Sequence, residues 1–325
     1  MRQPAATTPP PSLFPLPVVI DSDPGIDDCL ALLLALASPE LDVRGIAVSY
    51  GNTTVERACR NTVEIVRRAG RRLPLAIGAR RPLKRALAVA LETHGESGLG
   101  YAEVARSGVA LDFAQPLERL LERQPGPVTL VTLGPLTSLA LALRREPDVV
   151  RRRVARHVAM VGAVGVPGNT TAHSEFNAWC DPEALDLVLR AGLPTELVGL
   201  EVTRRVVVSG NEIGRLGHAA ADEARWLHDV LRFYLEFHRR HEGLDGCVVN
   251  DVLPIAALIR PDLVTCQGQR LVVDLEDGER RGQTRIDPQG MPVRVATSVR
   301  PQLVRGLLLE RVLPWLGAAA EAAAR

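Results

Sequence analysis

The chain has 325 residues, 46% of them hydrophobic, which is enough for a large core in one α/β domain. Only 3% of the residues are aromatic, so a surface that stacks on the bases of a nucleic acid is not expected. The net charge is +1, so binding to a charged membrane is not expected either. Neither nucleic acid nor a membrane is therefore an expected partner. Five cysteines are scattered without a Cys-x-x-Cys pair, which predicts reduced thiols in a cytoplasmic protein.

The N-terminal residues 1–12 predict a disordered, proline-rich tail, because their prolines interrupt any apolar stretch of a signal peptide. Residues 13–318 contain no internal repeat or linker and predict a single domain, followed by a short tail over 319–325. The longest apolar run, 30–37, is far shorter than the ~20 residues of a membrane-spanning helix.

Strand-like apolar runs alternate with helical patterns along most of this domain. In chain order, the expected strands are 18–20, 43–48, 75–77, 128–133, 158–161 and 196–198. Expected helices between them include 55–68, 136–144 and 182–190. This order predicts an α/β fold with an open, doubly wound and mostly parallel sheet, in which ligands bind beyond the carboxyl ends of the strands.

The C-terminal third has a different pattern. Residues 211–240 are typical of a helix, and 252–259 predict a short apolar helix. Residues 271–295 predict short strands joined by Asp-Gly and Pro-Gln-Gly turns, which we interpret as a small β-excursion packed on the main body near the C-terminus.

Four aspartates fall within eight residues, where the first strand is expected to end and a helix to begin. They are Asp21, Asp23, Asp27 and Asp28. One or two acids there would be explained by the positive end of the helix dipole, but four would not. Crowded carboxylates repel one another unless a cation neutralises them, and hard oxygen ligands at close spacing favour Ca²⁺ or Mg²⁺.

Two other acidic motifs compete for this segment. An EF-hand loop needs a bidentate acid at its twelfth position, which counted from Asp21 is Leu32, so that class is excluded. A haloacid-dehalogenase-type phosphatase also begins with Asp-x-Asp after a strand, but it carries Thr or Val where this chain has Gly25. That phosphatase stays open as a weaker alternative.

In their order along the chain, the polar motifs resemble those of the inosine-uridine-preferring nucleoside hydrolase family. The segment Asp-Ser-Asp-Pro-Gly-Ile-Asp-Asp at 21–28 is closely similar to the family signature. Further matching motifs are Gly51-Asn52, His94-Gly95-x-x-Gly98-Leu99, Leu133-Gly134-Pro135-Leu136-Thr137, Met160-Val-Gly-Ala163, Gly168-Asn169, Glu175-Phe176-Asn177, Asp181-Pro182-Glu183-Ala184 and Leu200-Glu201-Val202-Thr203. The resemblance covers most of the chain and implies a Rossmann-like catalytic domain over 13–318.

The resemblance also implies an activity, a cofactor and a set of residues. The activity is hydrolysis of the N-glycosidic bond of purine or pyrimidine ribonucleosides to ribose and free base. This reaction would serve nucleoside catabolism and salvage. The implied assembly is a homodimer or homotetramer. The implied ligands of one Ca²⁺ are Asp23, Asp28, Asp251 and the backbone carbonyl of Leu133, with Asp23 also activating a Ca²⁺-bound water. The implied sugar-binding residues are Asp27, Asn52, Met160, Asn169, Glu175 and Asn177. Asp21 would support these groups from behind.

The chain departs from the family at the leaving group. Many members carry His immediately before the last calcium-binding Asp, as a proton donor to the leaving base, and others carry Trp. This chain has Asn250 at that catalytic position, and an amide cannot act as a general acid. His94 is therefore our candidate for the leaving-group contact. The candidates for the base pocket are His94, Tyr234, His238 and His241.

The loss of the expected acid leaves a second function open. A non-catalytic or very slow Ca²⁺-dependent protein that binds ribosyl groups or nucleosides would keep the sugar site and lack the acid. The retained water-activating carboxylates favour the hydrolase, since a binding protein has no evident use for them.

Overall fold

The computed structural model describes residues 14–104 and 116–314. The tails expected over 1–12 and 319–325 lie outside these residues, as do the limits of the expected single domain, 13 and 318, so these expectations stay predictions. Along the described chain, no helix is both long and apolar enough to cross a bilayer.

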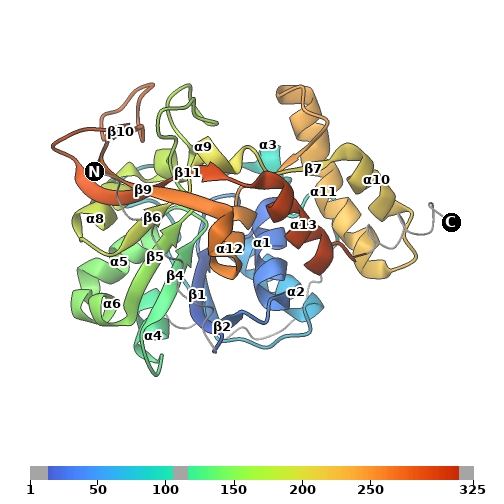
Figure 1. The fold of residues 1–325 in the computed structure, drawn as a ribbon, viewed down its shortest axis with the longest axis horizontal. Helices are drawn as coiled ribbons and strands as arrows, with labels where there is room; N and C mark the ends of the chain where they lie inside the picture. The colour runs from blue at the N-terminus through green and yellow to red at the C-terminus, as the bar shows by residue number, and fades with distance from the viewer. Residues whose placement is uncertain (1–13, 105–115, 315–325) are drawn as a thin grey trace, which may run out of the picture.

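A nine-stranded sheet forms the centre of the molecule, in the order β10-β9-β11-β6-β5-β4-β1-β2-β3 (Figure 1). From β11 to β3 in this order, all neighbouring strands are parallel. The strands are β1 (Leu16–Ser22), β2 (Leu41–Val48), β3 (Leu75–Ile77), β4 (Val128–Thr132), β5 (Val154–Ala159), β6 (Thr195–Leu197), β9 (Val264–Val273), β10 (Thr284–Ile286) and β11 (Met291–Val299). The predicted fold class, an open and mostly parallel α/β sheet, is confirmed.

The small β-excursion expected near the C-terminus is an extension of this central sheet. β11 pairs in parallel with β6, β9 is antiparallel to β11, and β10 is antiparallel to β9. A second sheet, which the sequence did not indicate, joins β7 (Val207–Ser209) and β8 (Gly246–Val248). In both cases a short strand pairs with a strand that is distant in sequence. The alternation of apolar and polar side chains does not indicate which strand that partner is.

Helices cover both faces of the sheet, because alternate residues of the buried strands point into two different apolar cores. On β1, Val18 and Ile20 belong to one core and Val19 belongs to the other. The helices of the first core are α1 (Ile26–Ala37), α2 (Val55–Arg68), α11 (Asp222–His241), α12 (Val252–Ile259) and α13 (Pro301–Arg311). Those of the second are α4 (Leu117–Glu122), α5 (Thr137–Arg145), α6 (Pro147–Arg153) and α8 (Pro182–Arg190).

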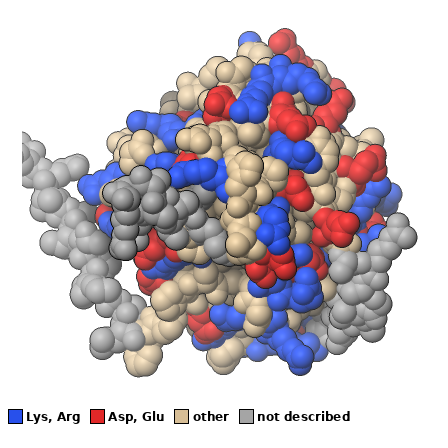
Figure 2. Space-filling view, turned by 90° about the vertical axis from the view of Figure 1, so that its right-hand side faces the viewer, with Lys and Arg blue, Asp and Glu red and all other residues tan. Residues whose placement is uncertain are grey.

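Shorter helices connect these layers. They are α3 (Leu91–His94), α7 (Phe176–Cys180), α9 (Leu200–Thr203), α10 (Gly210–Gly217) and the 3-10 helix η1 (Pro261–Leu263). The helical pattern over 211–240 divides into α10 and α11, and Ser209 begins α10 with a capping box in which its hydroxyl and the Glu212 carboxylate satisfy backbone N–H groups. Basic and acidic side chains are interspersed on the face of the molecule that carries α10 and α13 (Figure 2).

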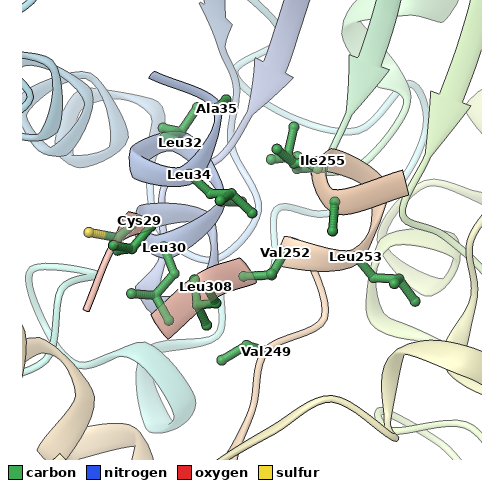
Figure 3. Close-up of a cluster of buried hydrophobic side chains, with 14 of the residues drawn as sticks. Cys29, Leu30, Leu32, Leu34, Ala35, Val249, Val252, Leu253, Ile255 and Leu308 are labelled. Atoms are coloured by element: carbon green, nitrogen blue, oxygen red, sulfur yellow. The ribbon is translucent and has the colours of Figure 1, made fainter. Parts of the chain in front are cut away.

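Helix α1 is apolar on all sides because it is enclosed by other elements. Its Leu30 and Leu34 face α12 and α13, where Val252, Ile255 and Leu308 complete the cluster (Figure 3). Every residue of α12 is buried. The N-terminal ends of α1 and α12 therefore lie near each other, which brings the first-turn acids of α1 close to the acid that precedes α12.

Candidate active site

The site lies beyond the carboxyl ends of β1, β2, β4 and β5, whose following segments line a cavity of about 300 Å³. All the expected sugar-binding residues line this cavity: Asp27, Asn52, Met160, Asn169, Glu175 and Asn177. Leu133, Asn250 and Asp251 line it as well. The parallel sheet thus brings to one place motifs that are up to about two hundred residues apart in the chain.

Asp28 is held by three donors at the start of α1. Its Oδ1 accepts from the Ser22 hydroxyl at 2.6 Å, and its Oδ2 accepts from the Gly25 N–H at 3.0 Å and the Asn52 side-chain amide at 2.7 Å. Asn52, expected to bind sugar, therefore also fixes the orientation of an expected metal ligand.

Asp23 is buried with one oxygen in use. Its Oδ2 accepts from the backbone N–H of Asn52 at 2.7 Å, whereas its Oδ1 has no hydrogen-bond partner among the described residues. Burial raises the pKa of Asp23 well above its usual value, and the neighbouring Asp28 raises it further.

Two glycines of the recognised motifs lie against Asp23. A Cβ at Gly51 would be 1.9 Å from Asp23 Oδ2, and a Cβ at Gly134 would be 2.4 Å from Asp23 Oδ1. Any side chain at either position would displace the carboxylate. The close approach of the backbone explains why both motifs need glycine.

In the described part of the chain, three buried carboxylates lie close enough together to hold one metal ion. Oxygens of Asp27, Asp28 and Asp251 all lie within 4.8 Å of one another. Burial and the nearby acids raise the pKa of Asp251 well above its usual value. Burial and Asp28 raise the pKa of Asp27 to about 7, although the Asn250 amide opposes this rise. The cluster contains Asp27, an expected sugar ligand, in addition to two of the expected metal ligands.

This donor set fits a hard divalent cation. All of its ligands are oxygens, the acids are buried beside one another without a basic side chain among them, and Asp23 keeps one oxygen unpartnered within the described chain. The Leu133 carbonyl accepts from the Asn177 amide at 2.6 Å and keeps a second lone pair for a ligand. A cation bound among these carboxylates would offset their mutual repulsion.

Asp21 lies behind the site and does not line the cavity. It is 2% exposed, and neither carboxylate oxygen has a hydrogen-bond partner within the residues that the structure describes. Burial raises its pKa to about 7. The supporting role expected for Asp21 stays a prediction.

Backbone contacts hold the side of the cavity where the sugar is expected to bind. Glu175 caps α7 by accepting from the N–H groups of Asn177 and Ala178, and its Oε2 also accepts from the Gly162 N–H at 3.0 Å. Burial raises the pKa of Glu175 to about 7. The Asn177 amide nitrogen donates to the carbonyls of Leu133 and Met160, so its amide oxygen is the atom left for a ligand.

Asn169 lies on an exposed loop, where its side-chain oxygen accepts from the Phe176 N–H at 2.9 Å. Arg204 holds this loop by donating to the carbonyls of Pro167 and Gly168, at 2.9 and 2.5 Å. Arg204 also lines the cavity, and sequence reasoning missed it. Its only signal was its place directly after the Leu-Glu-Val-Thr motif.

Three of the four base-pocket candidates lie together at the other end of the cavity. The ring centroids of His94 and Tyr234 are 5.4 Å apart, and those of Tyr234 and His238 are 4.3 Å apart. His241 is exposed, does not line the cavity, and stacks on Phe237 with ring centroids 4.8 Å apart. Phe237 does line it, and the i, i+3, i+4 spacing of Tyr234, Phe237 and His238 on α11 could have indicated this face.

The hydrogen bonds of His94 determine its tautomer. Its Nδ1 accepts from the Ile26 N–H at 3.1 Å, so in the neutral ring the proton lies on Nε2. Burial, together with His238, lowers the pKa of His94 to about 3. His94 therefore presents one N–H donor and stays uncharged.

These features define a doubly wound α/β enzyme with an acidic, oxygen-rich ligand pocket beyond its strand ends. The family model of the inosine-uridine preferring nucleoside hydrolases matches residues 18–305. The chain belongs to this family, and the predicted enzyme class, a ribonucleoside hydrolase, is confirmed. These findings give the phosphatase alternative no support.

Individual relatives agree with this assignment. The chain is similar to pyrimidine-specific ribonucleoside hydrolase RihA of Citrobacter koseri, with 37% identity over 277 residues that cover 84% of this chain and 88% of that one. Among solved structures, a purine-preferring ribonucleoside hydrolase from Gardnerella vaginalis matches with TM-score 0.85 and 27% identity, over 92% of this chain and 99% of that chain. The plant nucleoside hydrolase PpNRh1 matches with TM-score 0.80 and 31% identity, over 91% and 98%.

Proposed function

We propose that this protein hydrolyses the N-glycosidic bond of ribonucleosides by direct attack of water, with Ca²⁺ as its cofactor. The observation that carries the proposal is one cavity in which a buried acidic cluster, sugar-type acceptors and a His-Tyr-His group converge. Ribose hydroxyls suit the first two groups, and a planar base suits the third.

The residues that would hold the cation are Asp23, Asp28, Asp251 and the Leu133 carbonyl, with Asp27 beside them. When bound, Ca²⁺ supplies a Lewis acid that lowers the pKa of water and orients the ribose 2′- and 3′-hydroxyls. Asp23 is the base in this proposal, because its unpartnered Oδ1 can accept the proton of the attacking water.

Departure of the base leaves positive charge on the sugar. Oxygens of Asp27, Glu175 and Asn177 around the sugar would stabilise this oxocarbenium-like state more than the neutral substrate. No carboxylate needs to bond to the sugar, so the anomeric carbon should invert. The stereochemistry of the first-formed ribose can be followed by NMR.

Substrate choice is tested with a panel of nucleosides. The names of the curated relatives make uridine and cytidine the first substrates, followed by inosine, adenosine and p-nitrophenyl riboside. We expect release of free base with Ca²⁺ and none after chelation. Ribose binding without hydrolysis of any compound would instead support the binding-protein alternative.

The assembly and location also stay proposals. We propose a homodimer or homotetramer in the cytoplasm, acting in nucleoside catabolism. Light scattering of the purified protein would give a mass of two or four times 35.1 kDa, and a monomer would contradict this.

A further inference from the structure

Asn250, at the expected position of the leaving-group acid, has a different use. Its side-chain oxygen accepts from the Thr203 hydroxyl at 2.8 Å, and its amide beside Asp27 lowers the pKa of that carboxyl against the effect of burial. An amide has no acidic proton to give up at any accessible pH. Asn250 therefore positions Asp27, and a proton for the leaving base must come from another residue.

Two neighbours at the base end of the cavity are unsuited to this task. His94 carries its only ring proton on Nε2, because its Nδ1 accepts from the Ile26 N–H, and release of that proton would leave an imidazolate. Tyr234 is 4% exposed, and burial raises the pKa of its hydroxyl well above the usual value. Both can donate hydrogen bonds to a bound base, but neither gives up a proton readily.

His238 differs in how its two nitrogens are used. Its Nδ1 lies 2.8 Å from the Tyr234 carbonyl oxygen, which can only accept, so Nδ1 carries a proton in the neutral ring. Its Nε2 lies 3.9 Å from Glu242 Oε2, beyond hydrogen-bond distance. A second proton on Nε2 thus breaks no existing contact and gains a carboxylate partner.

The surroundings of His238 connect the cavity with solvent. The His238 side chain is 4% exposed and the Glu242 side chain is 47% exposed, and both residues line the cavity. Burial lowers the pKa of His238, while the Tyr234 carbonyl and Glu242 raise it. The other titratable groups near this ring are His94 on α3 and, across the cavity, Asp27 and Asp251.

We propose that His238 is the general acid for the leaving base, with Glu242 as the residue that returns its proton from solvent. The bond between C1′ and the base nitrogen breaks, its electron pair goes to the base, and the base takes the Nε2 proton of His238. Water adds to C1′, its proton goes to Asp23 Oδ1, and Asp23 then releases that proton to solvent. His238 is then reprotonated, and the net reaction consumes one water.

This inference rests on the proposed function, and one experiment separates the two. His238→Asn keeps an N–H near the Tyr234 carbonyl but has no nitrogen in the place of Nε2. We expect kcat for uridine or inosine to fall by about 10²-fold to 10⁴-fold, the usual share of general acid catalysis. The rate with p-nitrophenyl riboside, whose leaving group needs no proton, should change by less than about 3-fold.

Each outcome decides something different. An equal loss with both kinds of substrate, in His238→Asn and in His238→Gln, would show that His238 acts structurally and would overturn the inference. Unchanged turnover of uridine and inosine would also overturn it. A wild-type protein that hydrolyses no compound, p-nitrophenyl riboside included, would refute the proposed function itself.

Three further measurements complete the test. His228→Gln, which changes a histidine of α11 outside the cavity, should leave both rates unchanged. For the wild type, kcat with nucleosides should decline as rising pH removes the His238 proton, whereas p-nitrophenyl riboside should not show this limb. Glu242→Gln should move that limb to lower pH, because it removes the negative charge near Nε2. An identical alkaline limb with both kinds of substrate would contradict the inference.

Discussion

At Asp23, the structure leaves one carboxylate oxygen unpartnered within the described residues and makes room for it with glycine backbone on both sides. Desolvation of such an oxygen is costly unless it binds a cation or a proton. The same atom can therefore serve both as a ligand and as the acceptor of a proton from water. We therefore expect that an amide cannot replace this carboxylate.

Asp23→Asn tests this role directly. The variant keeps the size of the side chain and removes its charge, so we expect kcat/KM to fall by at least about 10²-fold and Ca²⁺ affinity to decrease. Steady-state kinetics and calcium titration measure the two effects. Asp186→Asn is the matched control, because Asp186 is a partly exposed residue of α8, paired with Arg190, that does not line the cavity. Full activity of Asp23→Asn would refute the assignment.

His157 shows a buried histidine with no part in the chemistry. It lies between strands, with Nε2 at 2.9 Å from the Thr132 hydroxyl and Nδ1 at 3.2 Å from the Thr195 hydroxyl. Burial lowers its pKa from 6.5 to about 3. Between pH 6.5 and about 3, His157 binds a proton in the unfolded chain but not in the folded protein. His157 therefore makes the free energy of unfolding fall as the pH falls through this range.

We predict that His157→Gln is less stable at pH 7, by roughly 1–3 kcal/mol, because its hydrogen bonds are imperfectly replaced. Between pH 6.5 and 4, its free energy of unfolding should nevertheless decline less steeply than that of the wild type. The difference between the two slopes should be up to about 1.4 kcal/mol per pH unit. Urea unfolding at several pH values measures both effects. Buried carboxyls such as Asp21 change the free energy of unfolding with pH in the opposite direction, but they do so equally in both proteins, so the comparison with the wild type removes their contribution. Parallel pH curves for the two proteins would contradict the prediction.

At the scale of elements, two kinds of support hold the site. The packing of α1 against α12 is buried, and it brings the acids at their N-terminal ends together. The loop that carries Asn169 is exposed and depends on two hydrogen bonds from Arg204. The metal side of the cavity should therefore tolerate changes less well than the outer sugar side.

Arg204→Ala tests the loop contact. Loss of two charge-assisted hydrogen bonds should free the loop and raise KM for a nucleoside by roughly 10-fold, with a smaller effect on kcat. Arg205→Ala changes the exposed neighbour, which does not line the cavity, and is the matched control. Equal KM values for both variants would show that Arg204 does not hold the loop in place.

At the scale of the whole molecule, binding of a cation and folding should be linked. The cluster joins acids from both ends of the chain, so an ion bound there stabilises only the folded state. At Ca²⁺ concentrations near 100 times Kd, we predict about 2.7 kcal/mol of added stability, lost on chelation. Thermal unfolding with Ca²⁺ and with EDTA measures this. The difference should disappear in Asp28→Asn, and its absence in the wild type would contradict the calcium assignment.

Much of the fold was predictable from local pattern. Apolar runs identified most parallel strands and the helices between them, because burial on both faces of a sheet imposes a continuous apolar stretch. Local pattern did not predict how β9, β10 and β11 pair, or that β7 and β8 exist. The partners of short strands are decided by contacts between residues that are distant in sequence. Local pattern likewise identified the acidic segment at 21–28, whereas its neighbours in space were indicated only by the family resemblance.

By itself, the sequence determined the family, the α/β class and the residue types of an acidic sugar pocket, because these depend on motifs in fixed order along the chain. Only the tertiary structure decided how those residues are used. It placed Asp27 in the acidic cluster, left His241 outside the cavity and brought Arg204 to the loop that carries Asn169. It also placed His238 Nε2 at 3.9 Å from Glu242 Oε2. Hydrogen-bond partners and exposure are properties of the packed chain, and no local pattern records them.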